Sequence, residues 1–441
     1  MKKLRIPHTI KRISIGAIFL MLLWMPSQAQ TQSTYSSTDS TTYAQYMTGD
    51  WDALIQSGQR AVSSGIDYFY LRMRIAYAYY SKGQYRLAIP HYIKALNFNA
   101  NDANAQYFLM QCYAYAGRAN DALKFSSKIS GQKLPDLKAK YQQSVLAGGI
   151  IYSYSGSNND VDFTHNSNAN LSIDAIQKTT NYFHNTHSFL SHRMGKSVIV
   201  NHSLDYLYKN EYNYIINGGT PYVLNDQALH QWTYGLNMQI TPFTGFTVTP
   251  GFHHIKIYIP TTYKNLKFNT SLYSLKAQYE LNKVSLGTSS LVGTLNDVKN
   301  IQIGGHFTWY PKANLNLYYS LDTYWQQQQV TKHQNIDIIV KNTIGFKISN
   351  YWWAEASVIL PEYNNFYDFS TGALYNSLES NKNTFSINNI FLTKNDKLSF
   401  TLGVTSNTNV SYLVQTEDPL NKTNGISYNT LTFTGGLIWK L

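Results

Sequence analysis

From residue 145 onward, hydrophobic and polar side chains alternate along the chain with a period of two. In the stretch "ANLNLYYSLDTYW", for example, Leu317 and Leu321 fall on one face, whereas Ser320 and Asp322 fall on the other. The same alternation recurs in segments of about ten residues, of which the last is "LTFTGGLIWKL" at residues 431–441. Each such segment is typical of a β-strand that has one apolar and one polar face.

The connections between these segments alternate strictly between short and long, which predicts 14 antiparallel strands. The short connections are 193–197, 241–245, 281–283, 311–314, 349–350 and 393–396, and the long ones are 155–178, 209–226, 260–267, 294–299, 327–335, 361–381 and 406–427. Outer-membrane barrels have an even number of strands, short periplasmic turns and longer outer loops. We therefore predict a transmembrane antiparallel β-barrel of about 14 strands over residues 145–441, with its apolar faces toward lipid. A soluble barrel would need those faces inside.

A period of 34 residues governs the region before the barrel. Gly49, Gly83 and Gly117 recur at this spacing, as do the pairs Tyr79/Tyr113 and Ala88/Ala122. The pattern resembles the tetratricopeptide repeat, in which two helices are joined by a tight turn. The resemblance implies a short α-helical solenoid over residues 43–144.

The predicted solenoid consists of a half repeat at 43–63, full repeats at 68–98 and 102–130, and a capping helix at 135–144. Asp67 and Asp102 stand where helix N-caps are expected. In this family the first helix of each repeat lines a concave groove. The corresponding residues are Tyr70, Met73, Tyr77, Tyr80, Ser81, Asn104, Tyr107, Gln111 and Tyr115. Such a groove would suit stacking on sugars or gripping an extended peptide; packing between repeats or against the barrel rim is the alternative.

Residues 1–29 have the layout of a secretory signal peptide. A basic start precedes an apolar run at 13–25, and Ala29 precedes the expected cleavage position. Such a segment is removed and takes no part in the fold. An uncleaved membrane anchor is the alternative, although the apolar run is short for a helical span. We assign residues 30–42 to a linker.

Composition adds a few constraints. Charged residues make up only 14% of the chain and Tyr occurs 37 times, whereas ordinary soluble domains have roughly 25% charged residues. The formal net charge is +12, but the basic residues are scattered, so nucleic-acid binding is not indicated. The single cysteine, Cys112, rules out an internal disulfide framework. No spacing typical of a metal or cofactor site appears, so we expect neither.

Histidines on the predicted strands are the remaining candidates for chemistry. His184, Ser188 and His192 share one face of a strand, as in a lipid hydrolase, but no base and orienting partner for the serine is evident. We therefore do not expect an enzyme. At His253 and His254 the apolar phase of the strand slips by one residue, for which a β-bulge is the simplest explanation.

Charged residues on the polar faces should point into the barrel interior. They are Asp322, Asp337, Lys341, Lys347 and Glu355. Because both signs occur, they suggest internal ion pairs or a mildly polar passage rather than an ion-selective ring. A barrel of about 14 strands lies between filled barrels of eight strands and open porins of 16. The long 155–178 loop could fold inward and close such a channel.

As a whole, the chain resembles outer-membrane barrels that carry an N-terminal tetratricopeptide domain. These include the YaiO-like family, which is similar in size, the poly-N-acetylglucosamine exporters and the surface-lipoprotein assembly modulators. The resemblance implies a barrel within outer-membrane lipid and repeats in the periplasm that recruit a protein partner or polysaccharide cargo. The final strand, Leu431 to Leu441, is expected to be recognised by the barrel-assembly machinery, although Leu441 stands where an aromatic residue is usual.

Three functions are compatible with this layout. The first is an export or assembly component, in which the repeats collect polysaccharide or another periplasmic cargo for the barrel. The second is a plugged barrel that serves as a structural docking anchor for periplasmic partners. The third is an enzyme that modifies lipid or glycan in the outer membrane.

Overall fold

The computed structural model describes residues 34–129, 144–157, 172–261, 265–330, 333–395 and 397–440. The predicted signal peptide and almost all of the predicted capping helix lie outside these residues. The chain divides into two compact units, Met1–Asp67 and Tyr68–Leu441. The first contains helices α2 (Tyr35–Thr48) and α3 (Trp51–Ser63), and the second contains the remaining described helices together with the barrel.

The helices repeat with the predicted period of 34 residues. In the second unit they are α4 (Phe69–Ser81), α5 (Tyr85–Phe98), α6 (Ala103–Tyr115) and α7 (Ala119–Ser126). Gly49, Gly83 and Gly117 occupy the turns inside successive helix pairs and have φ angles of 72°, 68° and 72°. Glycine adopts this left-handed conformation without the steric cost of a Cβ, which explains why it recurs there. The predicted helix–turn–helix repeats are confirmed.

The first repeat is longer than predicted. α2 begins at Tyr35, so this repeat is a complete helix pair rather than a half repeat, and residues 35–42 are helical rather than a linker. A capping box stabilises the start of the helix, because Thr34 and Ser37 accept hydrogen bonds from each other's backbone N–H groups. The polar composition of α2 concealed this helix, because the apolar period that marks the later helices is absent.

The two predicted N-caps of α4 and α6 have different outcomes. Asp102 caps α6, since its carboxylate accepts a hydrogen bond from the Ala105 N–H at 2.8 Å. The N-cap of α4 is Tyr68, one residue after the predicted Asp67, and no side-chain bond caps this helix. Buried apolar residues contribute to the packing of these helices: Leu71 of α4 and Leu109 of α6 are almost wholly buried.

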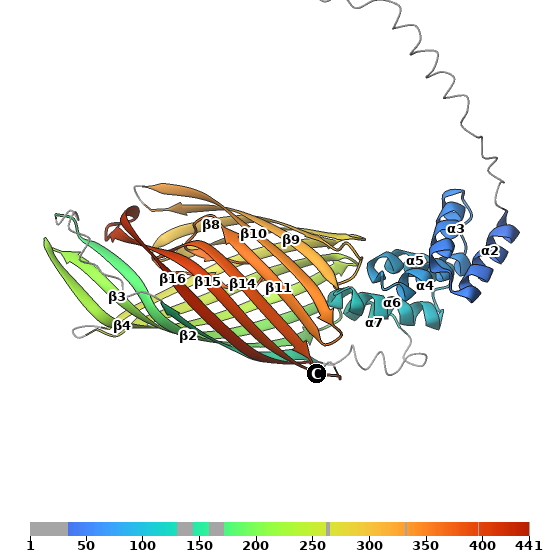
Figure 1. The fold of residues 1–441 in the computed structure, drawn as a ribbon, viewed down its shortest axis with the longest axis horizontal. Coiled ribbons are helices and arrows are strands. Elements are labelled where there is room, and N and C mark those ends of the chain that lie inside the picture. The colour runs from blue at the N-terminus through green and yellow to red at the C-terminus, as the bar shows by residue number, and fades with distance from the viewer. Residues whose placement is uncertain are drawn as a thin grey trace, which may run out of the picture. The chain divides into compact units, whose positions relative to one another are not determined.

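Fourteen strands form one closed antiparallel β-barrel (Figure 1). Their order around the barrel is β1, β16, β15, β14, β11, β10, β9, β8, β7, β6, β5, β4, β3 and β2, and pairing of β1 with β16 closes it. Their bounds are β1 Val145–Ser157, β2 Ala175–Met194, β3 Val198–Asn217, β4 Thr220–Phe243, β5 Phe246–Ile259, β6 Leu266–Glu280, β7 Val284–Leu295, β8 Val298–Trp309, β9 Leu317–Gln329, β10 Gln334–Ser349, β11 Trp352–Leu360, β14 Ser380–Leu392, β15 Leu398–Gln415 and β16 Asp418–Lys440. The predicted order of a helical region followed by a barrel of about 14 strands is confirmed.

Large apolar side chains cover the outer surface of the barrel. Ile303, Ile387 and Leu402 are 49%, 58% and 56% exposed, whereas Gln302, the neighbour of Ile303 on the other face, is wholly buried. So much exposed apolar surface is unfavourable in water but matches the lipid-facing band of a transmembrane barrel. Among the described helices, none is both long and apolar enough to cross a bilayer.

Strands continue through several of the predicted long loops. β3 and β4 extend to Asn217 and Thr220, so most of the predicted 209–226 loop is strand. Gly218 and Gly219 have φ angles of 55° and 79°, the positive values that a two-residue type I′ hairpin turn requires. β15 and β16 likewise continue through most of the predicted 406–427 loop. Polarity alone therefore did not mark the strand ends.

β5 lacks the bulge that was predicted at His253 and His254. Its pairing with β6 is continuous, and its pairing with β4 keeps one register through both histidines. The apolar phase changes because the interior itself becomes apolar: Ile255 is wholly buried in a cluster with Leu272 and Tyr367. β5 is therefore apolar on its outer face at one end and on its inner face at the other.

Candidate functional site

Residues 361–379, between β11 and β14, fold into the barrel interior, and we call them the inward segment. They include a short hairpin, β12 (Phe366–Tyr367) and β13 (Leu374–Tyr375). Phe366 packs in one cluster with residues of β9, β10 and β11. Tyr367 packs in another with residues of β5, β6 and β7. The segment therefore contacts two separate arcs of the wall. The loop that was predicted to fold inward, 155–178, lies largely outside the described residues.

Amide side chains on β8 and β9 satisfy the backbone of the inward segment. Gln302 donates to the Tyr367 carbonyl at 2.7 Å, and Gln326 donates to the Asn365 carbonyl at 2.7 Å. The Asn365 side chain in turn donates to Gln328 at 2.9 Å. A buried backbone group must be paired, and irregular backbone at membrane depth is tolerated only where protein or water surrounds it. Glutamines that look like ordinary lumen residues in the sequence thus hold the segment in place.

A buried ion pair fixes the turn between β12 and β13. Lys341 Nζ lies 2.6 Å from Asp368 Oδ2, and the two residues are 3% and 1% exposed. Ser370 and Thr371 donate hydrogen bonds of 2.7 Å to the same carboxylate. Desolvated charges of this kind are stable only when they are paired and hydrogen-bonded. The sequence predicted that Lys341 faces inward, but it gave no indication of its partner.

The other four predicted lumen charges also have partners among interior residues. These partners are His306 for Asp322 (2.7 Å), Tyr318 for Glu355, the Trp353 ring for Lys347 (5.0 Å to the ring centre) and Gln328 for Asp337 (3.5 Å). Each of these charged side chains therefore has an interaction partner inside the barrel. Within the described part of the barrel, these residues form no ring of a single sign.

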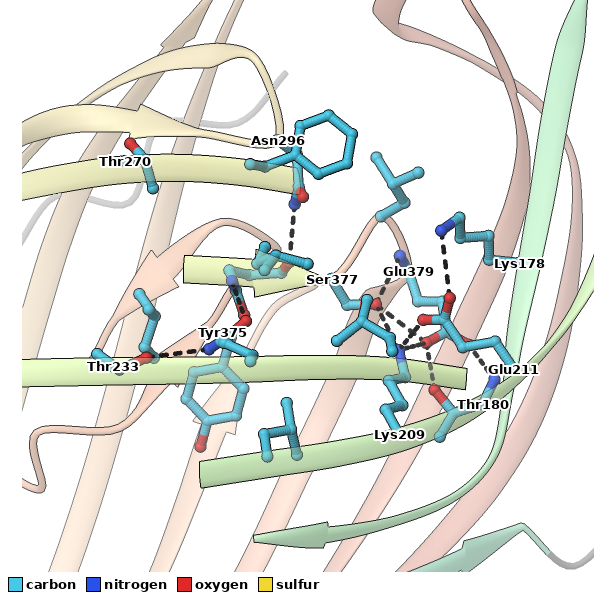
Figure 2. A pocket seen from close by; sticks show the side chains of 18 of the residues that line it. Lys178, Thr180, Lys209, Glu211, Thr233, Thr270, Asn296, Tyr375, Ser377 and Glu379 are labelled. Carbon is cyan, nitrogen blue, oxygen red and sulfur yellow. Dashed lines mark hydrogen bonds and ion pairs between the residues drawn. The ribbon is translucent and has the colours of Figure 1, made fainter. Parts of the chain in front are cut away.

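A second charged network holds the end of the inward segment next to β14. Glu379 accepts hydrogen bonds from the Thr180 N–H at 2.8 Å and from Lys209 Nζ at 2.9 Å (Figure 2). Lys209 Nζ also lies 2.8 Å from Glu211, which in turn lies 3.2 Å from Lys178 Nζ. The two lysines and two glutamates come from β2, β3 and the inward segment, and their charges balance.

Beside this network the interior contains a cavity of about 1250 Å³. Strands β2 to β7 and residues 372–379 of the inward segment form most of its lining, part of which is drawn in Figure 2. The inward segment therefore narrows the interior without filling it. Within the residues that the structure describes, no group of three or more His, Cys, Asp or Glu is placed to hold a metal ion.

A buried arginine joins helix α5 to the short turns of the barrel. Arg86 is 2% exposed, and its guanidinium donates to Glu280 at 2.5 Å and to the Leu281 and Asn282 carbonyls at 3.0 and 3.1 Å. The guanidinium carbon lies 4.0 Å from the centre of the Tyr310 ring. A planar guanidinium with five donors can satisfy several acceptors at once. Arg86 and Glu280 are 194 residues apart, so no local pattern could reveal the pair.

Helix α7 contacts a neighbouring turn in a similar way. Asp121 accepts a hydrogen bond from the Gly245 N–H at 2.8 Å and another from Arg118 at 2.6 Å. Lys124 donates to the Thr241 carbonyl at 3.0 Å. Helices α5 and α7 thus contact the short turns that connect β4 to β5 and β6 to β7. The helices of the second unit lie on the short-turn side of the barrel.

Three of the predicted groove residues belong to an aromatic cluster between α4, α5 and α6. The rings of Tyr77 and Tyr80 stack with centres 6.2 Å apart, and both contact the ring of Phe108. The Tyr115 ring centre lies 4.9 Å from that of Tyr85. Burial raises the pKa of the Tyr80 hydroxyl to about 12, so this group is neutral at any physiological pH. These tyrosines therefore contribute to packing between the helices.

Tyr115 is nevertheless exposed at the border of this cluster, and several other predicted groove residues are accessible as well. Tyr70, Tyr107 and Tyr115 are 64%, 39% and 48% exposed. Asn104 and Ser81 are exposed as well, whereas Met73 and Gln111 are half-buried. The surface of α4 and α6 thus carries an exposed aromatic edge beside the packed cluster, and we call Tyr70, Tyr107 and Tyr115 the aromatic edge.

His184 and His192 of β2 do not form a catalytic arrangement with Ser188. His184 is hydrogen-bonded to the Tyr152 hydroxyl at 2.5 Å, and His192 is hydrogen-bonded to His202 at 3.1 Å. Ser188 lies four residues from each, which is about 13 Å along a strand that rises about 3.3 Å per residue. Neither histidine can therefore act as its base. That the chain is not an enzyme stays a prediction.

The chain resembles known proteins in fold only. No family model and no curated protein matches the sequence. A FadL homologue from Pseudomonas aeruginosa matches 77% of this chain and 94% of its own at 7% identity, with a TM-score of 0.41. The toluene transporter TodX from P. putida matches 69% of this chain and 92% of its own at 7% identity and a TM-score of 0.41. The structure of MamA from MSR-1 matches 27% of this chain and 67% of its own at 18% identity and a TM-score of 0.21. These likenesses are too distant to indicate a function.

Proposed function

We propose that this protein is a docking protein of the outer membrane. In this proposal a barrel closed by its own inward segment anchors helical repeats in the periplasm, where they bind a partner. The observation that carries the proposal is the buried Arg86 network, which attaches α5 to the β6–β7 turn. A desolvated guanidinium is stable only where its partners are in place, so the network favours one position of α5 on the barrel.

The side of the membrane follows from the turns. Outer-membrane barrels place their short turns in the periplasm. Arg86 and Asp121 attach their helices to turns of this kind. The proposal therefore assigns the repeats to the periplasm, as the resemblance to barrels with tetratricopeptide domains implies.

The inward segment supports a barrel that is closed at rest. Its hairpin turn is held by the Lys341–Asp368 pair and its end next to β14 by the Lys209–Glu379 pair. The glutamines of β8 and β9 hold the backbone at Asn365 and Tyr367. Removing one partner from a buried ion pair costs about 3–5 kcal/mol. Displacing the segment would break both pairs and leave uncompensated charges in the interior, so the pairs favour this one placement of the segment.

The aromatic edge is the proposed contact surface for the partner. Tyrosine supplies a large apolar area and a hydroxyl at a small entropic cost, and it is enriched at protein interfaces. Tyr70 and Tyr107 are exposed on α4 and α6. A periplasmic protein or a polysaccharide is the partner that this surface suits.

Site-specific photo-crosslinking in living cells tests this role. A benzoylphenylalanine at Tyr107 should crosslink to an envelope component of defined mass, and Tyr70→Ala together with Tyr115→Ala should reduce the yield several-fold. The matched control is the same photo-crosslinker at Phe98, an aromatic residue that is 52% exposed at the end of α5. Equal crosslinking from Tyr107 and Phe98 would refute the assignment of the surface.

Export is a second candidate, and the cavity favours it. The inward segment leaves about 1250 Å³ of the interior open. A limited rearrangement of this segment would connect the cavity to the far end of the barrel. In that case the repeats would collect polysaccharide or another periplasmic cargo for passage through the barrel. A steady pore in planar bilayers is the result that would favour export over docking.

A further inference from the structure

We propose that the cavity beside the inward segment binds a small amphiphile, a molecule with an apolar body and an uncharged head that forms hydrogen bonds. The site is built from β2 to β7 and the inward segment. The inference concerns the barrel interior alone and does not rest on the proposed docking role of the helices.

An apolar arc on β5 and β6 supplies the first observation. Ile257 and Ile259 pair directly with Phe268 and Leu266 on the neighbouring strand, and all four line the cavity. Strand alternation places them on the same face as Ile255, which is wholly buried against the inward segment. Phe268 and Leu266 are nevertheless 44% and 41% exposed. Their exposed surface therefore borders the cavity rather than lipid.

The polarity of these strand ends is the reverse of that in the membrane-spanning part of the barrel. On β5 the residues that alternate with the arc are Lys256 and Tyr258, and they face outward. The interior of a transmembrane barrel is normally polar, and apolar side chains against water are unfavourable. Single exposed apolar residues need no explanation, but a contiguous apolar patch indicates a binding surface. An apolar body in the cavity would cover the arc.

The opposite wall carries charges that already neutralise one another. Lys178, Lys209, Glu211 and Glu379 all line the cavity and form a connected set of ion pairs of 2.8 to 3.2 Å. A charged head placed here would lose its hydration without gaining an unpaired counter-ion. An uncharged head would lose much less hydration free energy, because hydrogen bonds alone can satisfy a buried hydroxyl or amide.

His253 supplies a hydrogen-bonding group with unused capacity. It lines the cavity and is 6% exposed, and its Nε2 has no hydrogen-bond partner within the described structure. Buried polar atoms in native proteins nearly always have such a partner. Because Nε2 is itself buried, a hydroxyl or amide of the ligand would complete it after a small rotation of the imidazole toward the cavity. The imidazole packs on Tyr367, with ring centres 4.9 Å apart.

An amphiphile fits this lining better than an oligosaccharide does. Sugars are recognised largely by stacking on aromatic rings and by dense hydrogen bonding. Here the arc consists mainly of the aliphatic residues Ile257, Ile259 and Leu266. The amides Gln231 and Asn376 on the lining are already bonded to each other at 2.7 Å. The apolar arc, the mutually neutralised ion pairs and the unpartnered His253 nitrogen together favour a ligand with an apolar body and a single uncharged polar end.

Equilibrium dialysis of tritiated 1-decanol against the full mature chain in lipid nanodiscs tests the proposal, with empty nanodiscs subtracted. We expect saturable binding of one equivalent per barrel. The double variant Ile257→Asn/Leu266→Asn should weaken binding at least tenfold, which corresponds to about 1.4 kcal/mol. Tyr258→Asn changes the outer face of the same strand and should leave the affinity unchanged.

A conservative variant separates loss of the site from loss of the fold. Ile257→Leu/Leu266→Met keeps the arc apolar and should retain wild-type affinity, and all variants should keep the heat-modifiable gel mobility of a folded barrel. Uptake that never saturates, or saturable binding that the asparagine variant leaves intact, would overturn the site. Tighter binding of decanoate than of decanol at pH 7.5 would contradict the uncharged head. Saturable binding of maltotriose, together with no binding of decanol, would contradict the assignment of the ligand as an amphiphile.

Discussion

Replacing Arg86 with Met should weaken the attachment of helix α5 to the barrel while leaving the barrel folded. Methionine keeps an apolar stem of similar length but removes the guanidinium. Glu280 then loses its ion-pair partner, and the carbonyls of Leu281 and Asn282 lose their donor. The strands themselves keep every backbone hydrogen bond, because these contacts involve only a side chain of the helix and the turn between β6 and β7.

The size of the effect follows from the burial of the pair. Removing one partner of a buried ion pair costs about 3–5 kcal/mol. Arg86 is 1% exposed at its side chain, but Glu280 is 16% exposed, so water can partly solvate the orphaned carboxylate and the lower end of the range applies. A loss of about 3 kcal/mol changes the equilibrium constant for detachment about 100-fold, since each 1.4 kcal/mol is a factor of ten.

Hydrogen exchange measured by mass spectrometry on the full chain in nanodiscs reports this change. Amides of α5 that lose their partner on detachment, such as the N–H of residue 86, which donates to the Ala313 carbonyl at 2.9 Å, should exchange about 100-fold faster in Arg86→Met, whereas those of the barrel strands should be unaffected. Lys94→Met is the matched control, because Lys94 is exposed on the same helix. The double variant Arg86→Met/Glu280→Gln should recover part of the protection by removing the orphaned charge. Unchanged protection of α5 in Arg86→Met would refute the anchoring role.

Three further predictions address other parts of the fold. Lys341→Met orphans the buried carboxylate of Asp368 and should destabilise the inward segment by about 3 kcal/mol, seen as faster exchange at residues 366–375; an unaffected segment would show that the pair is dispensable. Gly117→Ala forces a φ of 72° on alanine, with its Cβ 3.1 Å from a Leu315 methyl, and should lower stability by about 1–2 kcal/mol in urea unfolding of the helices. Burial raises the pKa of the Cys112 thiol, so maleimide at pH 8 should label the chain only after denaturation; rapid labelling of the folded protein would contradict this burial.

Local patterns allowed the architecture to be predicted. Alternation such as Leu317/Ser320/Leu321 reports which face of a strand meets lipid, because side chains on a strand alternate between two faces. The recurrence of Gly83 and Gly117 at a fixed spacing reports a turn that repeats. The alternation is local to each strand and the repeated glycines mark each turn, so tertiary contacts were not needed to interpret either signal.

The interior and the attachment of the helices could not be predicted in this way. Gln302 and Gln326 look like ordinary lumen residues, although they bind the backbone of a segment tens of residues away. The phase change around His253 was a real signal, but a bulge explained it as well as an apolar interior did. The continuous pairing of β5 with β4 and β6 and the packing of Ile255 against the inward segment distinguish the two explanations.

Conductance of the purified protein in planar lipid bilayers tests the central claim, that the barrel crosses the membrane and is closed by residues 361–379. The wild-type protein should show no steady pore. A variant in which residues 363–378 are replaced by a short Gly-Ser linker should show a steady, ohmic conductance, which also proves insertion. A steady pore in the wild-type protein, or none in the variant despite a folded barrel, would contradict the account.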